Sequence, residues 1–98
     1  MAELRWTEEA LRWLRDIHDY VAADNPDAAQ ELASAIYTRI QILRQFPDLG
    51  YRYRDEPEGE IRILVYGHYR IAYLRGSLGV LHVLGIFHGA LDLEQYLG

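Results

Sequence analysis

The residues best suited to chemistry in this chain are arginines placed among tyrosines. Tyr51–Arg54 alternates tyrosine with arginine, and Arg62 and Arg70 follow on two stretches of alternating apolar residues. Arginine binds carboxylates and phosphates through paired N–H donors, and arginine and tyrosine together can stack on nucleic acid bases. The pattern is compatible with a functional surface and equally with an ordinary solvated sheet face, on which these arginines pair with Glu58 or Glu60 across strands.

Other catalytic chemistries have little support in the residues present. The chain holds no cysteine and no lysine, which excludes disulfides, thiolate metal sites, cysteine nucleophiles and Schiff-base chemistry. Ser34 lies inside a predicted helix and Ser77 in a turn, neither in the context of an activated nucleophile. The four histidines show no i,i+4 pairing: His18, His68, His82 and His88. We therefore expect no metal site and no cofactor.

The length and the charge balance restrict the possible classes of protein. Ninety-eight residues, half of them hydrophobic, are enough for one domain, and a formal net charge of −5 makes a poor general binder of nucleic acid. No apolar run approaches the roughly 20 residues of a membrane span, and the first residues lack the form of a secretory signal. We expect one soluble, cytoplasmic domain over residues 1–98 that does not bind membranes.

The first half of the chain predicts a strand followed by two helices. Residues 2–6 alternate in the manner of a half-buried strand. Thr7 is suited to cap a helix that runs to about residue 23, with acidic residues in its first turn. Asn25 can cap a second helix with Pro26 at its first position, and the short connection favours an antiparallel hairpin. The second helix ends at residues 46–50.

The second half of the chain predicts an antiparallel meander. Residues 51–60 are polar and turn-rich and predict an irregular or edge segment. Alternation then predicts three strands, over 61–66, 69–74 and 80–87, joined by short turns. Residues 88–98 are expected to form a helical turn or to lie extended. The resulting order is β-α-α-β-β-β, an α+β two-layer sandwich in which the meander packs on the helix hairpin.

The strand alternation also predicts which side chains share a face. It assigns Ile63 and Ile71 to the side of the helices, so that Arg62 and Arg70 share the opposite face. That face also carries Leu64, Ala72 and Leu74, which are too apolar to be left bare, and this predicts a cover from a partner chain, the tail or a second subunit. The predicted core is Trp6, Leu14, Ile17, Leu32, Ile36, Ile40, Ile63, Ile71 and Val83, and the residues predicted to bind a target or partner are Arg52, Arg54, Arg62, Leu64, Arg70 and Leu74.

A series of short motifs, weak one by one, resembles a known family when taken in order. The motifs are Trp6-Thr7 with Ala10-Leu11, Asn25-Pro26-x-Ala28-Ala29, Leu43-x-x-Phe46-Pro47-x-x-Gly50, Ile61-Arg62-x-Leu64, Tyr69-Arg70-Ile71-x-Tyr73 and Val83-x-x-Ile86-x-His88-Gly89. Together they resemble the RelE/ParE toxin superfamily of type II toxin–antitoxin and plasmid-stabilisation modules. The resemblance implies the same β-α-α-β-β-β layout.

The resemblance implies two alternative mechanisms and one kind of partner. RelE-like members are ribosome-dependent mRNA endoribonucleases that use several lysines and arginines, whereas ParE-like members poison DNA gyrase. Both are neutralised by a small antitoxin that also binds operator DNA, and a toxin–antitoxin heterotetramer is one expected assembly. We expect the second helix and the adjoining sheet rim to bind an extended or helical antitoxin segment, and DNA to be contacted only through the antitoxin.

Departures from the RelE-like pattern favour the ParE branch. Arg70 matches the RelE-like arginine, Arg62 lies near the position of one lysine, and Tyr96 falls about where the C-terminal tyrosine stands. However, Leu91 stands where many members carry an arginine, and phosphoryl chemistry needs concentrated positive charge. We therefore expect a gyrase-binding toxin without catalytic residues. The alternatives are a nuclease using Arg62, Arg70 and Tyr96, and a degenerate member that only binds its antitoxin.

Overall fold

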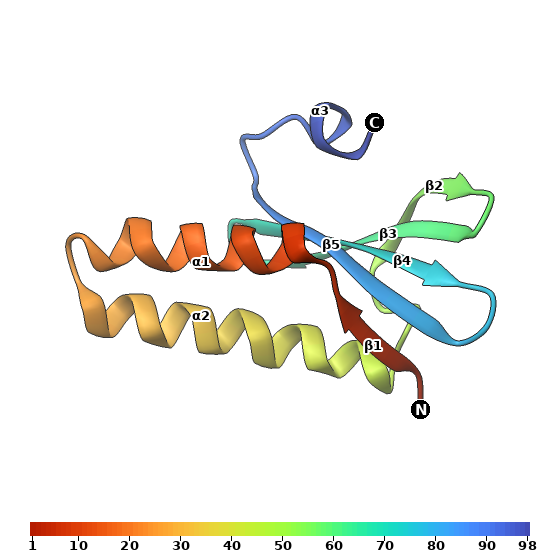
Figure 1. The fold of residues 1–98 in the computed structure, drawn as a ribbon, viewed down its shortest axis with the longest axis horizontal. Coiled ribbons are helices and arrows are strands. Elements are labelled where there is room, and N and C mark those ends of the chain that lie inside the picture. The colour runs from red at the N-terminus through yellow and green to blue at the C-terminus, as the bar shows by residue number, and fades with distance from the viewer.

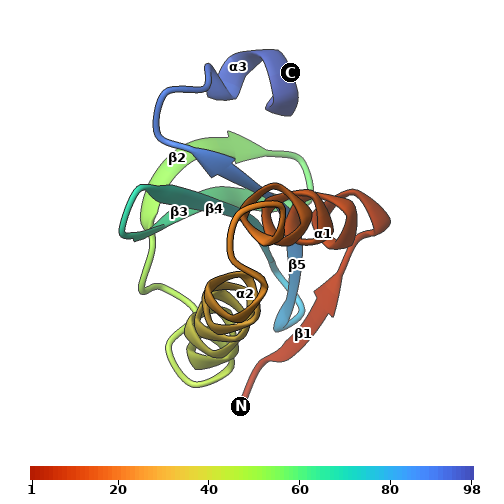
Figure 2. The same ribbon diagram turned by 90° about the vertical axis from the view of Figure 1, so that its left-hand side faces the viewer.

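In the computed structural model, which describes residues 1–98, a helix hairpin packs on one face of a five-stranded sheet and a short third helix lies over the other (Figures 1 and 2). The elements are β1 (Glu3–Trp6), α1 (Glu8–Ala22), α2 (Pro26–Gln41), the 3₁₀ turn η1 (Ile42–Arg44), β2 (Tyr51–Glu56), β3 (Gly59–Tyr66), β4 (Tyr69–Gly76), β5 (Val80–His88) and α3 (Leu93–Leu97). None of the helices is long and apolar enough to cross a membrane.

Side-chain caps fix the starts of the two long helices, as the sequence predicts. The Thr7 hydroxyl oxygen accepts a hydrogen bond from the Ala10 N–H at 3.1 Å and its O–H donates to the Val83 carbonyl at 2.8 Å. The first bond caps α1, and the second ties that helix to β5. The Asn25 side chain accepts from the Ala28 N–H at 3.1 Å at the start of α2. Capping and helix–strand contact therefore depend on the same threonine.

The sheet confirms the meander and adds two features to it. Its strand order is β1-β5-β4-β3-β2, with antiparallel pairing from β2 through β5. Residues 51–56 form a regular edge strand, interrupted between Arg52 and Arg54 by a shift in register. The strand β1 pairs in parallel with β5, for example Leu4 with Leu81, so the sheet is mixed and not wholly antiparallel. With the short helix α3 at the end, the observed order of strands and α-helices is therefore β-α-α-β-β-β-β-α, one strand and one helix more than predicted.

The prediction that Arg62 and Arg70 share one sheet face is wrong. The two-residue turn at 67–68 pairs Tyr66 with Tyr69, so even-numbered residues of β3 share a face with odd-numbered residues of β4. Arg62 lies opposite Tyr73 on the side of the helices, and Arg70 lies on the outer face. Leu64, predicted on the outer face, packs in the main core and is only 3% exposed.

Each face of the sheet has its own apolar core. The main core, between the sheet and the helix hairpin, comprises Ala10, Ile36, Ile40, Leu43, Leu64, Ile71, Tyr73, Leu81, Val83 and Ile86. A smaller outer core comprises Ile61, Ile63, Ala72, Phe87 and Leu93. The predicted core residues are buried or half-buried, and Trp6, Leu14, Ile17 and Leu32 are the half-buried ones. The predicted cover on the outer face is the chain's own tail, which contributes Leu93.

Candidate functional site

The predicted binding residue Arg62 holds a surface loop against the sheet. Its Nε donates to the Gly50 carbonyl at 2.7 Å, and its Nη2 donates to the Asp48 carbonyl at 3.0 Å. The neighbouring Tyr73 hydroxyl donates to the Pro47 carbonyl at 2.7 Å and accepts from the Gly50 N–H at 3.0 Å. Four backbone groups of residues 47–50 are thus satisfied by two side chains from the sheet, and little of Arg62 is left for a partner.

The electrostatics keep this pair in one protonation state at neutral pH. Burial raises the pKa of Tyr73, opposed in part by the Gly50 N–H and by the charge of Arg62. Burial alone would lower the pKa of Arg62, but the hydrogen bond and charge of Glu60 outweigh it and the net pKa is raised. Tyr73 therefore stays a neutral donor and Arg62 stays a cation across the physiological range.

Two further predicted binding residues, Arg54 and Arg70, hold the tail. Arg70 Nη2 donates to the carbonyls of Gly89, at 3.2 Å, and of Leu91. Arg54 Nη2 donates to the Leu97 carbonyl at 2.6 Å, at the end of α3. Hydrogen bonds from charged donors are stronger than neutral ones, so both ends of the tail are fixed to the sheet. These two arginines contact the chain itself where the sequence predicts contact with a partner.

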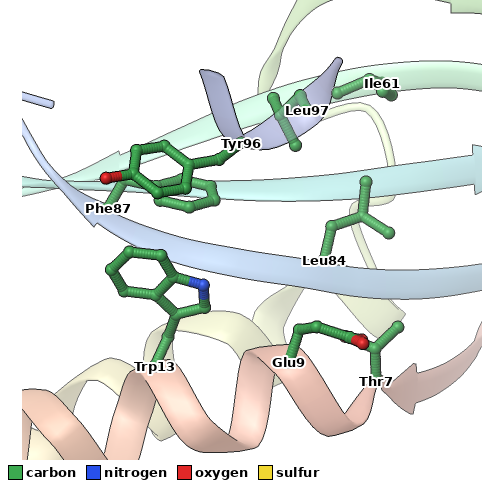
Figure 3. Close-up of a pocket in the computed structure, with 8 residues that line it drawn as sticks. All are labelled: Thr7, Glu9, Trp13, Ile61, Leu84, Phe87, Tyr96 and Leu97. Carbon is green, nitrogen blue, oxygen red and sulfur yellow. The ribbon is translucent and has the colours of Figure 1, made fainter. Parts of the chain in front are cut away.

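Three aromatic rings pack together where the tail helix α3 meets α1 and β5, and a cleft adjoins them (Figure 3). Trp13 from α1 packs edge-on against Phe87, with ring centroids 4.8 Å apart, and against Tyr96 at 5.2 Å. Tyr96 stacks on Phe87 at 5.3 Å. The adjoining cleft has a volume of about 390 Å³ and is lined by Thr7, Glu9, Trp13, Ile61, Leu84, Phe87, Tyr96 and Leu97. The tail helix α3, the first helix and the outer sheet face thus form its walls.

The cleft is suited to an apolar side chain and not to a phosphate. Six of its eight lining residues are hydrophobic, and its one charged residue, Glu9, is acidic. No group of three or more His, Asp or Glu side chains is placed to hold a metal ion. A phosphodiester would meet no cation here, because the lining contains neither arginine nor histidine. The arrangement can bind an apolar anchor from a partner with a basic neighbour facing Glu9.

The structure does not bring together the three residues that a nuclease was predicted to use. Arg62 lies on the face of the helices. Arg70 lies on the outer face in register with Phe87, on which Tyr96 stacks, so Arg70 and Tyr96 share a face from which Arg62 is absent. Among the predicted partner-binding residues, Leu74 is half-buried on the outer face beside Ala72. Arg52 is exposed and pairs with Asp55 at 3.4 Å. The remaining predicted residues therefore lie apart and do not form one cluster.

Sequence reasoning missed Trp13 and Phe87 as parts of a site. Trp13 packs against both cores, because α1 lies against β5, a strand that contributes side chains to the core on each face of the sheet. A signal was present, since the apolar side of α1 is wider than one sheet face requires. Phe87 gave no such signal, because its role depends on the tail folding back over it.

These features define a small α+β protein that offers an apolar cleft and in which Arg54, Arg62 and Arg70 bind carbonyls of the chain itself. The chain matches the family model described as "ParE toxin of type II toxin-antitoxin system, parDE" over residues 4–93. The chain therefore belongs to the ParE toxin family of type II toxin–antitoxin systems.

Two curated toxins are similar in sequence. The chain is 32% identical over 90 residues to Toxin RelE2 of Caulobacter vibrioides, an alignment that covers 92% of this chain and 98% of that protein. It is 40% identical over 47 residues to Putative toxin Y4kP of Sinorhizobium fredii, covering 48% of this chain and 49% of that protein. The second match thus spans about half of either chain.

A solved structure shares the fold. A chain from the chromosomal ParDE toxin–antitoxin system of P. aeruginosa superposes with a TM-score of 0.74, at 24% identity, covering 90% of this chain and 96% of that one. This similarity confirms the α+β architecture, including the helix hairpin on the sheet.

Proposed function

We propose that this ParE-family chain is a cytoplasmic toxin that inhibits DNA gyrase by binding it and catalyses no reaction itself. The observation that carries the proposal is that the two arginines a nuclease would use are hydrogen-bonded within the chain. Arg62 and Arg70, which a nuclease would need at one phosphate, lie on opposite faces and donate to the chain's own carbonyls. Family membership supports the toxin class, and the geometry favours a binding mechanism over a chemical one.

The competing function is a ribosome-dependent endoribonuclease, and one observation favours it. The relative that aligns with nearly the whole chain carries the name RelE2. Cleavage of RNA requires donors aimed at the charge that develops on the phosphate. Tyr96, the proposed acid or base, stacks on Phe87 in an apolar site that Arg62 does not share. The geometry therefore argues against this alternative.

The proposal includes neutralisation by a cognate antitoxin. The cleft of Figure 3 is the surface we expect an antitoxin segment to occupy, with an apolar side chain between Trp13 and Leu84 and a basic one near Glu9. The assembly would be a toxin–antitoxin heterotetramer, and operator DNA would be bound through the antitoxin alone. The second helix and the adjoining sheet rim, which the sequence favours, stay the alternative surface for the antitoxin, and hydrogen exchange on adding the antitoxin would distinguish the two.

The test is induced expression followed by two separate assays. We expect the purified protein to inhibit supercoiling by DNA gyrase, to leave mRNA on ribosomes uncut, and to lose its activity when the cognate antitoxin is added. Cuts in mRNA at the ribosomal A site that vanish in folded Arg70→Ala and Tyr96→Phe variants would establish the nuclease instead. A protein that binds antitoxin but inhibits neither gyrase nor translation would be a degenerate member of the family.

A further inference from the structure

The loop that connects η1 with β2 turns apolar side chains toward solvent. Phe46, Leu49 and Tyr51 are 57%, 44% and 51% exposed, and we call these three residues the loop cluster. Scattered single apolar residues on a surface need no explanation, but these three lie within six consecutive positions, two in the loop and Tyr51 at the start of β2. An apolar cluster in so short a segment is typical of a binding surface.

The backbone of this loop is held from beneath. Tyr73 and Arg62 satisfy the carbonyls of Pro47, Asp48 and Gly50 and the amide of Gly50. Further support comes from within the loop, where the Leu49 N–H donates to the Phe46 carbonyl at 3.0 Å.

Gly50 itself is packed so closely that a β-carbon would lie 2.7 Å from the Ile63 carbonyl oxygen. The backbone of the loop is therefore held in one conformation, in which Phe46, Leu49 and Tyr51 are exposed. A fixed frame lowers the entropy cost of binding.

The charges beside the loop cluster differ in sign from those of the whole chain. Arg44 and Arg52 flank it in sequence, and both are exposed. Arg44 is in no ion pair, and Arg52 pairs only with the exposed Asp55 at 3.4 Å. The acidic residue within the loop, Asp48, is paired with Arg75. Although the whole chain has a net charge of −5, two exposed arginines thus lie beside the loop cluster, and one of them, Arg44, is in no ion pair.

We propose that the loop cluster, with Arg44 and Arg52, is the surface by which the toxin binds its cellular target. The chemistry it fits is an acidic protein surface with an apolar pocket for Phe46 or Tyr51. Tyrosine and arginine dominate the strongly contributing residues of protein interfaces, and buried aromatic anchors carry most of the binding energy. Nucleic acid fits less well, because two arginines on an acidic chain neutralise few phosphates. The inference rests on the proposed function in one respect, that the toxin acts by binding a protein.

The inference separates the two proposed binding surfaces of the toxin. The antitoxin cleft lies under α3 and is lined by Trp13 and Leu84, whereas the loop cluster lies beyond η1 and next to the edge strand β2. If the loop cluster serves the target alone, toxicity and antitoxin binding can be removed independently. A shared surface would make the two activities fail together.

The experiment compares Phe46→Ala and Tyr51→Ala, singly and combined, with Tyr20→Ala and Leu78→Ala as controls. The control side chains are 85% and 91% exposed and lie in α1 and in the turn between β4 and β5. Growth inhibition on induction, inhibition of gyrase supercoiling, antitoxin affinity and thermal unfolding are measured for each variant.

We expect the double loop variant to weaken growth inhibition and target inhibition at least about tenfold, a typical effect of losing interface anchors. Its antitoxin affinity and unfolding temperature should stay within the range of the controls. The charge variants Arg44→Glu and Arg52→Glu should also weaken toxicity. In the supercoiling assay their loss of inhibition should be larger at low salt than at high salt.

Four results would overturn the inference. Full toxicity in the folded double variant would remove the loop from the target surface. Parallel loss of toxicity and antitoxin affinity would assign the loop to the antitoxin. A wild-type dimer that the double variant abolishes would assign it to a second copy of the chain. Sequence-independent binding to nucleic acid that the arginine variants abolish would replace the protein target.

The same measurements distinguish failure of this inference from failure of the gyrase proposal. Toxicity that depends on the loop without any effect on supercoiling would refute gyrase as the target and retain the loop as the target surface. Gyrase inhibition that persists in the double variant would retain gyrase as the target and refute the loop as the surface that binds it. A wild-type chain that does not inhibit growth would refute both.

Discussion

The loop at residues 46–51 and the tail at residues 89–98 are both held to the sheet by arginine side chains, but the loop exposes apolar side chains whereas the tail buries one. In both, arginine side chains of the sheet donate hydrogen bonds to carbonyls of an irregular segment. The loop is held from its inner side, so its apolar side chains point outward. The tail is held at its ends, so Leu93 packs inward on the outer core. Arginines that bind carbonyls of their own chain can therefore hold a segment so that its apolar side chains are exposed, as in the loop, or buried, as in the tail.

The largest loss of folding stability is expected from Phe87, the ring on which the tail packs, and not from the arginines that bind the tail. Phe87→Ala removes the ring on which Tyr96 and Trp13 pack, and a buried phenylalanine replaced by alanine costs about 3–5 kcal/mol. Urea denaturation should report this loss, and hydrogen exchange should show α3 opening first. If α3 keeps its protection in the variant, the arginines alone hold the tail.

A smaller effect is expected where the loop is held. Tyr73→Phe leaves the Pro47 carbonyl and the Gly50 amide without their partner, which costs about 1–3 kcal/mol. Hydrogen exchange at the Gly50 amide measures the loss directly, while amides of α3 should be unchanged. Equal loosening of loop and tail would contradict the independence of the two regions.

The pH dependence of stability sharpens the same prediction. Burial raises the pKa of Tyr73 above its ordinary value of 10.0, so the folded chain holds this proton more tightly than the unfolded chain. The contribution is therefore complete below pH 10 and is lost as the pH rises through the raised pKa. Urea denaturation at successive alkaline pH values should show a steeper decline for the wild type than for Tyr73→Phe. Parallel declines would mean that Tyr73 titrates alike in both states.

The smallest effect is expected at the far end of the tail. Arg54→Ala removes a bond to the Leu97 carbonyl and a partly exposed ion pair with Glu56 at 2.7 Å. Such pairs contribute less than about 1 kcal/mol, because water competes for both partners. Denaturation should barely change, whereas exchange at the last amides of α3 should accelerate. A stability loss as large as that of Tyr73→Phe would mean that the two attachments are equivalent.

The features that the sequence predicts correctly are those written locally. Thr7 and Asn25 mark helix starts through hydrogen bonds from amides three residues further on, and Pro26 marks one by standing at the first position of α2; the structure confirms both starts. The face of β3 was misassigned because alternation gives a period of two but not its phase, which the two-residue turn at 67–68 fixes through pairing. The family can also be recognised from the sequence, because its motifs lie at fixed spacings along nearly the whole chain.

The features of the site that could not be predicted depend on distant contacts. The bonds from Tyr73 to Gly50 and Pro47 span 23 and 26 residues, and the bond from Arg54 to Leu97 spans 43. Nothing in the local pattern at Arg54 or Arg62 shows that their donors are used within the chain. Arginines on a strand look alike in sequence whether they bind a partner or a carbonyl of their own protein.

The placement of β1 beside β5 has a consequence for the order of events during synthesis. Residues 3–6 emerge from the ribosome before the other strands of the sheet, yet their only strand partner is made more than seventy residues later. Until residues 80–88 follow, α1 also lacks the strand it packs on, and the two halves of the sheet have no bridge. The cleft, which is lined by Leu84, Phe87 and Tyr96, therefore forms only after β5 and α3 have been made. The loop at residues 46–51 needs only Arg62 and Tyr73, so its frame can form earlier in synthesis than the cleft.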